Sequence, residues 1–190
     1  MPDYRRLRIP GATIFFSVCL ERRQSSMLVN NIDQLRYAVA ATQRERPFTI
    51  DAFVVLPDHL HCIWTLPERD SDYSVRWGAI KARFSMGMRR AGFTPPLPIG
   101  REKGGVNPAL RRKGEVGLWR PRFWEHHIRS NHDFRAHQEF CLWDPVRHGL
   151  VDHPDEWPFS SIHRDRMAGT LCDSSLRPQT EHTPIAGHSL

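Results

Sequence analysis

Long apolar runs are absent from this 190-residue sequence. No stretch approaches the roughly 20 apolar residues that a membrane-spanning helix needs. The arginines at positions 5, 6 and 8 lead into only a short apolar stretch, so the start of the chain does not resemble a secretory signal segment. We therefore expect neither a membrane span nor export.

Cysteine is scarce and unpaired. The four cysteines, Cys19, Cys62, Cys141 and Cys172, form no C-x-x-C pair, which argues against a zinc ribbon. Three of them lie inside apolar runs, where a buried and reduced thiol is the expected state. This usage predicts a reducing, cytoplasmic location.

Acidic residues are outnumbered by basic ones. The chain has 27 Lys and Arg against 21 Asp and Glu, a formal net charge of +6. A short basic chain suggests a polyanionic partner, of which nucleic acid is the commonest, although charge alone fits a basic protein without such a partner equally well. Hydrophobic residues at 39% and charged residues at 25% exclude wholesale disorder.

Local patterns predict an α+β fold. Runs of β-branched and aromatic residues are typical of strands, and helical spacing of apolar residues is typical of amphipathic helices. We expect strands at 12–20, 48–56 and 59–66 and in the extended segment 117–129. We expect helices at 33–46 and 133–143, and between them a helix that begins at a cap, Ser71 or Asp72, and ends at about residue 90. The resulting β-α-β-β-α-β order is ferredoxin-like, an antiparallel sheet with helices on one face, followed here by a C-terminal helix.

Two stretches fall outside this pattern. Residues 91–114 are rich in Pro, Gly, Lys and Arg and lack a usable periodicity, which predicts a flexible basic loop. The chain becomes polar and proline-containing near its end, which predicts a disordered tail over 165–190. We therefore expect one domain, residues 1–164, with a loop inside it and a tail after it.

Two histidines stand one residue apart on a predicted strand. Because side chains alternate along a strand, His59 and His61 should point to the same face, roughly 6–7 Å apart. Both imidazoles could then reach one divalent metal ion, which polarises a phosphate oxygen in phosphodiester chemistry. The alternative is a pair of surface histidines without a ligand.

Basic side chains accompany the second long helix. Its apolar stripe is formed by Tyr73, Trp77, Ile80 and Phe84. Arg76 and Lys81 lie off that stripe, so we expect them to face solvent or a phosphate backbone.

Arginine and aromatic residues are interleaved in the extended segment. Trp119, Arg120 and Arg122 offer base stacking and phosphate contacts, which suits single-stranded or hairpin DNA. Phe123 and Trp124 should point to opposite faces, so at least one of them is expected in the core.

The residues around the histidine pair carry a resemblance. The run VLPDHLHCIWTLP at 55–67 resembles the HUH motif of the single-tyrosine transposases associated with repetitive extragenic palindromes (REP). Further matches follow the family's order along the chain: Tyr4-Arg5-Arg6, Arg76-Trp77 with Ile80-Lys81, 119–129, 144–151 and 157–161. The resemblance covers about residues 4–164, nearly the whole domain.

The resemblance implies a fold, a reaction and a partner. Such transposases have a fold similar to the ferredoxin-like order, bind DNA hairpins and act on adjacent single strands. A helix tyrosine attacks the phosphate and leaves a 5′-phosphotyrosine link and a free 3′-hydroxyl, while the two histidines hold Mg²⁺ or Mn²⁺. Several such enzymes work as dimers, so a homodimer is one expectation, and a DNA partner implies association with the nucleoid. By this resemblance the DNA-binding positions are Tyr4, Arg5, Arg6, Arg76, Lys81, Trp119, Arg120 and Arg122.

Phenylalanine stands where the family places its nucleophile. In the family pattern the tyrosine lies four residues before an Asn, and this position is Phe140, which has no hydroxyl to attack with. Asp144 replaces the Asn and would share a helix face with Phe140, so its carboxylate is a candidate third metal ligand. Alternatively, Asp144 caps a turn before Pro145.

Two functions are therefore open from the sequence. The chain is either a metal-assisted enzyme that cleaves and rejoins DNA, as the family does, or a catalytically dead derivative that binds the hairpin. The three tyrosines of the chain, at positions 4, 37 and 73, all precede the helix of Phe140, which favours the second. Hydrolysis by a metal-bound water is a third route, but no residue in the sequence stands out as orienting a water.

Overall fold

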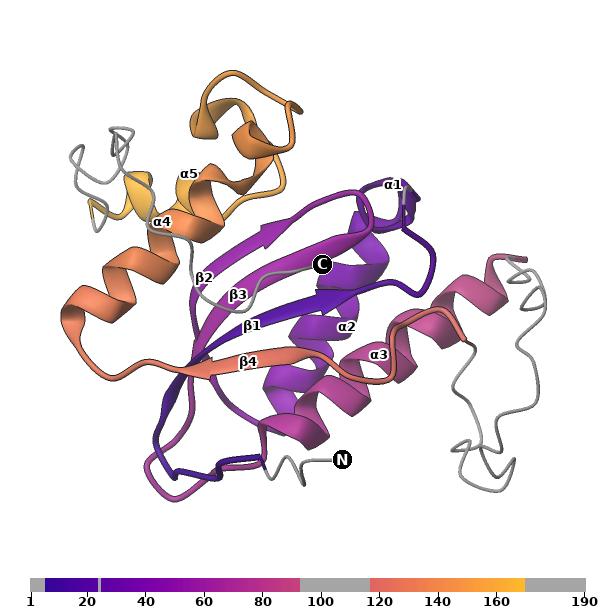
Figure 1. The fold of residues 1–190 in the computed structure, drawn as a ribbon. Helices are drawn as coiled ribbons and strands as arrows, with labels where there is room; N and C mark the ends of the chain where they lie inside the picture. The colour runs from indigo at the N-terminus through magenta and orange to yellow at the C-terminus, as the bar shows by residue number, and fades with distance from the viewer. Residues whose placement is uncertain (1–5, 24, 93–116, 170–190) are drawn as a thin grey trace, which may run out of the picture.

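A four-stranded antiparallel sheet is the centre of the molecule (Figure 1). The computed structural model describes residues 6–23, 25–92 and 117–169. The strands lie in the order β2-β3-β1-β4, and every neighbouring pair is antiparallel. This is the ferredoxin-like order that the sequence predicts. The strands are β1 (Thr13–Cys19), β2 (Thr49–Val55), β3 (His59–Thr65) and β4 (Trp124–His127).

Two long helices cover one face of the sheet and a third covers the other (Figure 1). The helices α2 (Ile32–Glu45) and α3 (Tyr73–Arg90) pack on the face that carries Phe16, which confirms the expected pair. The C-terminal helix α4 (Asn131–Arg147) packs on the face that carries Phe15. Because both faces are covered, β1 and β3 are buried along nearly their whole length. The short elements are α1 (Met27–Asn30), η2 (Pro154–Glu156) and α5 (Ile162–Met167).

Helix α4 is longer than the sequence predicts. It starts at a Ser130 cap, whose side chain accepts a hydrogen bond from the Asp133 amide, and it continues through Pro145 to Arg147. Gly149, with φ +64°, then ends it: the Gly149 and Leu150 amides donate to the carbonyls of Val146 and Pro145, a Schellman motif. Asp144 therefore lies inside the helix rather than in a turn.

The predicted ends of the domain and its loop can be compared with the structure only in part. Helix α5 continues past the predicted end of the domain at residue 164. Apart from residues 91, 92 and 165–169, the expected loop at 91–114 and tail at 165–190 lie outside the described residues. Within the described residues, every helix is too short or too polar to cross a membrane.

The expected side-chain cap of α3 is wrong for Asp72. Asp72 occupies the N-cap position, but among the described residues its side chain makes no capping hydrogen bond. Its carboxylate instead faces Arg8 at 3.3 Å, and its amide donates to Asp70. A ψ of 52° departs from the extended backbone that usually aims an N-cap side chain at the helix amides.

Arg76 is an internal side chain, contrary to its expected place at the surface. It is 0% exposed, and its guanidinium donates to both Asp70 carboxylate oxygens at 2.7 and 3.0 Å. It also donates to the carbonyls of Pro47 and Arg46 at 2.8 and 3.2 Å, joining α3 to the end of α2. The hydrogen bonds from Arg76 hold the pKa of Asp70 below its usual value.

Lys81 is also drawn inward. It is 7% exposed, and its ammonium donates to the Arg120 carbonyl at 2.8 Å, near the rings of Trp119 and Phe123. The expectation that Lys81 faces solvent or a phosphate is therefore wrong. Helical spacing separates polar from apolar positions, but it does not reveal that a polar end group has a buried acceptor.

We predict that Arg76→Met lowers the free energy of unfolding by about 3 kcal/mol, because it leaves buried acceptors without their donor. Urea unfolding at pH 7 measures the change. Arg89→Met, an exposed position on the same helix, is the control and should stay within about 0.5 kcal/mol of wild type. Equal stabilities of the two variants would contradict the internal role of Arg76.

Candidate metal centre

The histidine pair faces helix α4. His59 and His61 lie on the same side of β3, with ring centroids 5.1 Å apart and ring planes at 79°. Both residues are buried, at 2% and 0% exposed. The structure thus places the two imidazoles together, as strand alternation predicts, and under a helix rather than at an open surface.

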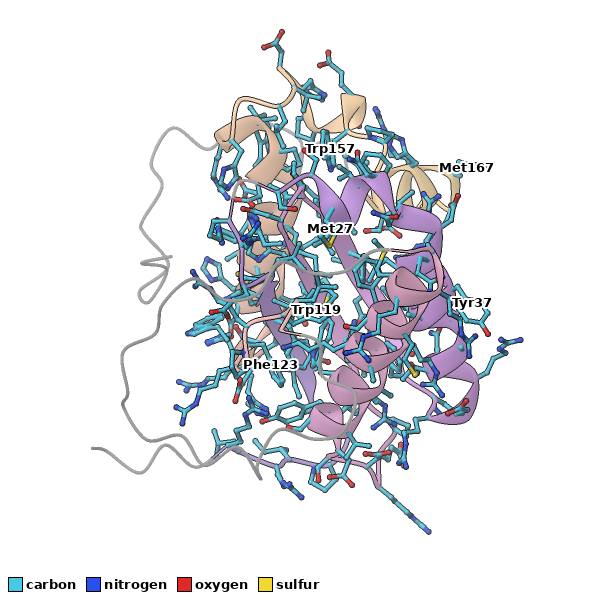
Figure 2. All side chains as sticks on the ribbon, turned by 90° about the vertical axis from the view of Figure 1, so that its right-hand side faces the viewer. Met27, Tyr37, Trp119, Phe123, Trp157 and Met167 are labelled. Atoms are coloured by element: carbon cyan, nitrogen blue, oxygen red, sulfur yellow. The ribbon has the colours of Figure 1, made fainter. Side chains whose placement is uncertain are left out.

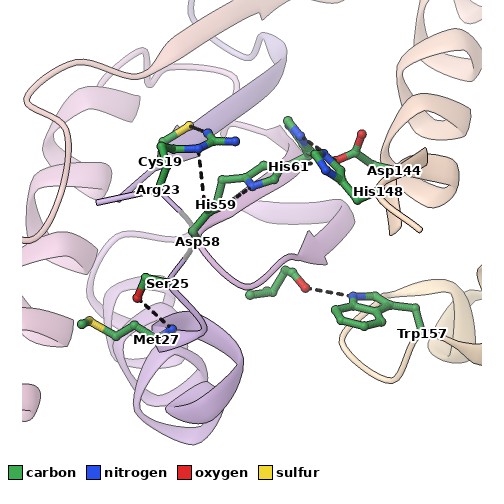
Figure 3. Close-up of polar contacts among 11 residues, drawn as sticks. Cys19, Arg23, Ser25, Met27, Asp58, His59, His61, Asp144, His148 and Trp157 are labelled. Atoms are coloured by element: carbon green, nitrogen blue, oxygen red, sulfur yellow. Dashed lines mark hydrogen bonds and ion pairs between the residues drawn. The ribbon is translucent and has the colours of Figure 1, made fainter. Parts of the chain in front are cut away.

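Helix α4 brings a carboxylate to both imidazoles. Oδ2 of Asp144 lies 3.3 Å from Nε2 of His59 and 3.2 Å from Nε2 of His61 (Figure 3). Asp144 is 4% exposed. Burial raises the pKa of Asp144, but hydrogen bonds from His59 and His61 outweigh this and hold the pKa well below its usual value. Of the two roles that the sequence leaves open for Asp144, the geometry supports the ligand.

A second carboxylate orients His59 from behind. Asp58 Oδ1 lies 2.6 Å from His59 Nδ1, and Arg23 Nε lies 3.2 Å from Asp58 Oδ2 (Figure 3). A proton on Nδ1 would be donated to Asp58 and would leave the Nε2 lone pair for an ion, the arrangement typical of metal-binding histidines. Sequence reasoning missed both residues, although Asp58 directly precedes His59.

The three side chains fit a divalent metal ion. One ligand atom from each of His59, His61 and Asp144 lies within 4.8 Å of the others. Nε2 of His59 and Nε2 of His61 both face the same Asp144 oxygen, so both nitrogens can bind one ion at that point. Imidazole and carboxylate donors suit Mn²⁺ and related ions.

A second cluster has the same residue types but not the same geometry. His126 on β4 and Asp133 and His137 on α4 also lie within 4.8 Å of one another. The rings of His126 and His137 are stacked, however, with centroids 4.4 Å apart and planes at 12°. Stacked rings lie in separate, nearly parallel planes, so their in-plane lone pairs do not meet at one ion, and this cluster is a hydrogen-bonded junction. His127 points to the other face of the sheet, toward Tyr73, so the two adjacent histidines diverge.

Phe140 lies against the candidate metal centre. Its ring centroid is 5.2 Å from that of His61 and 5.8 Å from that of Phe15. The Arg147 guanidinium carbon lies 4.7 Å from the centre of the Phe140 ring. The position that the resemblance assigns to the nucleophile is therefore beside the histidines, and a hydrocarbon ring fills it.

Two tyrosines in the described residues lie away from this centre. Tyr37 projects from α2 and is 61% exposed (Figure 2), while Tyr73 on α3 is buried and donates to the Leu7 carbonyl. Both helices cover the face of the sheet opposite α4. Neither hydroxyl can replace the one that Phe140 lacks without a rearrangement of the fold.

The predicted DNA-binding side chains are only partly at the surface. Arg122 is exposed and Arg120 is half-buried. Arg6 lies over the Phe123 ring and pairs with Glu125 at 3.3 Å. Tyr4 and Arg5 lie outside the described residues.

The aromatic residues of this segment belong to the core. Trp119 is 8% exposed and packs edge-on against Phe84, so the expectation that it offers a stacking surface is wrong (Figure 2). Its position opposite Leu20, in an isolated bridge at the end of β1, explains the burial. Phe123 and Trp124 pack into the clusters on opposite faces of the sheet, as alternation predicts.

The junction between β4 and α4 should respond to acid. The Asp133 carboxylate accepts hydrogen bonds from the Arg129 amide at 2.9 Å and from His126 at 2.9 Å. Burial raises the pKa of Asp133, but these bonds outweigh it and hold the pKa below its usual value. Because the folded pKa is the lower one, the stabilisation is present above the unfolded pKa of about 3.9 and is lost as the pH falls through the folded pKa.

We predict that Asp133→Asn lowers the free energy of unfolding by about 1–2 kcal/mol at pH 7. The difference from wild type should shrink as the pH falls below about 4. Urea unfolding across this range measures it, with Asp152→Asn, at an exposed position, as the control. A difference that is independent of pH would count against the ionised junction.

Comparisons with known proteins identify the family of the chain. No family model matches the chain. The REP-associated tyrosine transposase of Escherichia coli (strain K12) is 41% identical over 169 residues, which cover 89% of this chain and 87% of that protein. A putative REP-associated tyrosine transposase of Haemophilus influenzae (strain ATCC 51907 / DSM 11121 / KW20 / Rd) is 36% identical over 168 residues, 88% of this chain and 89% of that protein. A solved structure of a REP-associated tyrosine transposase bound to a REP hairpin matches with a TM-score of 0.79 and 38% identity, over 100% of this chain and 99% of that one. The chain belongs to the family of REP-associated tyrosine transposases.

Proposed function

We propose that this chain binds hairpin DNA and holds a divalent metal ion, but does not itself form the covalent tyrosine–DNA link of its family. The observation that carries the proposal is the Phe140 ring, 5.2 Å from the His61 ring and without a hydroxyl. Support for the hairpin comes from the solved relative that is bound to one. Support for the ion comes from the converging side chains of His59, His61 and Asp144.

Each residue of the centre has a distinct role in this proposal. His59 and His61 offer neutral nitrogen ligands, and Asp144 offers an anionic oxygen. Asp58 fixes the ring of His59, and Arg23 fixes Asp58. A bound Mg²⁺ or Mn²⁺ would polarise a phosphate oxygen of the DNA. The missing element is the attacking hydroxyl, since a phenyl ring cannot act as a nucleophile.

Cleavage and rejoining of DNA is the second candidate function. The retained geometry of the metal centre favours it, because such a centre is built for phosphodiester chemistry. It requires a nucleophile from elsewhere than Tyr37 or Tyr73. The homodimer that the resemblance implies stays a prediction, and sedimentation of the DNA-free chain would check it.

We predict that Phe140→Tyr creates a covalent DNA adduct where the wild type forms none. The substitution places a hydroxyl beside the centre with little change in ring packing. The measurement is a denaturing gel after incubation with Mn²⁺ and a labelled single strand that carries a REP-type hairpin.

Two variants make this experiment specific. Phe140→Leu lacks a hydroxyl and should form no adduct. Phe140→Tyr combined with His59→Ala should also form none, because it removes a metal ligand. An adduct with the wild-type chain would refute the proposal, and the cleavage function would replace it.

We also predict that hairpin binding weakens steeply with added salt, because phosphate contacts release counterions. Arg122→Ala removes an exposed arginine and should weaken binding uniformly across sequences, lowering the salt slope by about 1. Fluorescence anisotropy with a labelled hairpin measures both, with Arg89→Ala as the control on the face opposite α4. Binding that is insensitive to salt would contradict a phosphate-directed interface.

A further inference from the structure

A fourth side chain converges on the carboxylate of the metal centre. Nε2 of His148 lies 3.6 Å from Asp144 Oδ2, the same oxygen that faces the Nε2 atoms of His59 at 3.3 Å and His61 at 3.2 Å (Figure 3). Three imidazole nitrogens, two from β3 and one from the end of α4, thus surround a single oxygen. Sequence reasoning assigned no role to His148.

The end of helix α4 fixes the position of His148. His148 is four residues after Asp144, and its amide donates to the Asp144 carbonyl at 3.0 Å, so both side chains lie on one face of the helix. The Schellman motif at Gly149 stops the chain directly afterwards. His148 is therefore part of the same rigid element as Asp144.

His148 occupies the open side of the centre. Its side chain is 40% exposed, against 2% for His59 and 1% for His61. Its ring makes an angle of 64° with the His59 ring, with centroids 5.1 Å apart. Within the described residues, the set whose ligand atoms all lie within 4.8 Å of one another is His59, His61 and Asp144, so the exposed His148 ring must turn further inward to reach the same ion.

We propose that His148 is a fourth protein ligand of the metal centre, which then offers three imidazoles and one carboxylate. This inference rests on the proposed function, because it extends the metal centre assigned there. Imidazole nitrogen suits first-row transition metals, whereas Mg²⁺ prefers oxygen ligands and retains several waters. The donor set therefore selects Mn²⁺ over Mg²⁺.

The test is Mn²⁺ binding by the purified full chain in the absence of DNA. Electron paramagnetic resonance of free Mn²⁺ gives the dissociation constant, and electron spin-echo modulation from nitrogen counts the bound imidazoles. For His148→Ala we expect binding at least about tenfold weaker, a loss that even an outer-shell partner can cause, and one imidazole fewer than in wild type. Competition with Mg²⁺ should show a smaller preference for Mn²⁺ in this variant.

Three controls accompany the variant. His132→Ala removes an exposed histidine from the first turn of the same helix and should leave both readouts unchanged. His148→Gln preserves the bulk of the side chain and should behave like His148→Ala. Circular dichroism of each variant confirms that the fold is kept.

The outcomes separate this inference from the proposed function. Two imidazoles on Mn²⁺ in wild type, with unchanged affinity in His148→Ala, would overturn the role of His148 and leave the centre of His59, His61 and Asp144 standing. A wild-type chain that binds no Mn²⁺ would overturn both the inference and the proposed metal centre. An equal loss in His132→Ala would overturn the inference by showing a nonspecific effect of histidine removal.

Discussion

The contact between one carboxylate on α4 and two imidazoles on β3 is the interaction on which the site depends. Asp144 reaches His59 and His61 only because α4 lies across the face of the sheet to which both rings point. Side-chain alternation along β3 turns both rings toward that face. Because α4 includes residue 144, Asp144 lies on the helix face that is turned toward the rings. A change in either would separate the oxygen from the nitrogens.

Apolar packing holds this contact against the cost of burying charge. Moving an ionised carboxylate out of water costs several kcal/mol even after relaxation. On the same face, Phe15, Ile63, Leu142 and Trp157 are buried in one cluster, and each such side chain contributes about 1.5–3 kcal/mol. The Trp157 ring nitrogen donates to the Val55 carbonyl, which attaches the segment after α4 to the edge strand β2. The cluster thus fixes α4 while the imidazoles stabilise the ionised form of Asp144.

Much of the fold could be predicted from local patterns, because strand alternation and helical spacing report which side of an element is buried. The same patterns place His59 beside His61, since that inference needs only the period of β3.

Local patterns fail where a residue's environment comes from distant segments. Arg76 and Lys81 occupy polar helix positions, yet main-chain carbonyls of residues 46, 47 and 120 draw them inside. Pro145 is interpreted as a helix stop, although α4 continues past it to Arg147. Asp58 and Arg23 reach the centre from the segments before β3 and after β1, and no regular spacing reveals the Arg23 contact.

We propose that the centre of His59, His61 and Asp144, and not the cluster of His126, Asp133 and His137, holds a metal ion. Anomalous diffraction from crystals soaked in MnCl₂ tests it most directly, because manganese scatters anomalously and the peak locates the ion. We expect a peak between His59, His61 and Asp144, and none between His126 and His137. A peak at the stacked pair, or none at Asp144, would contradict it.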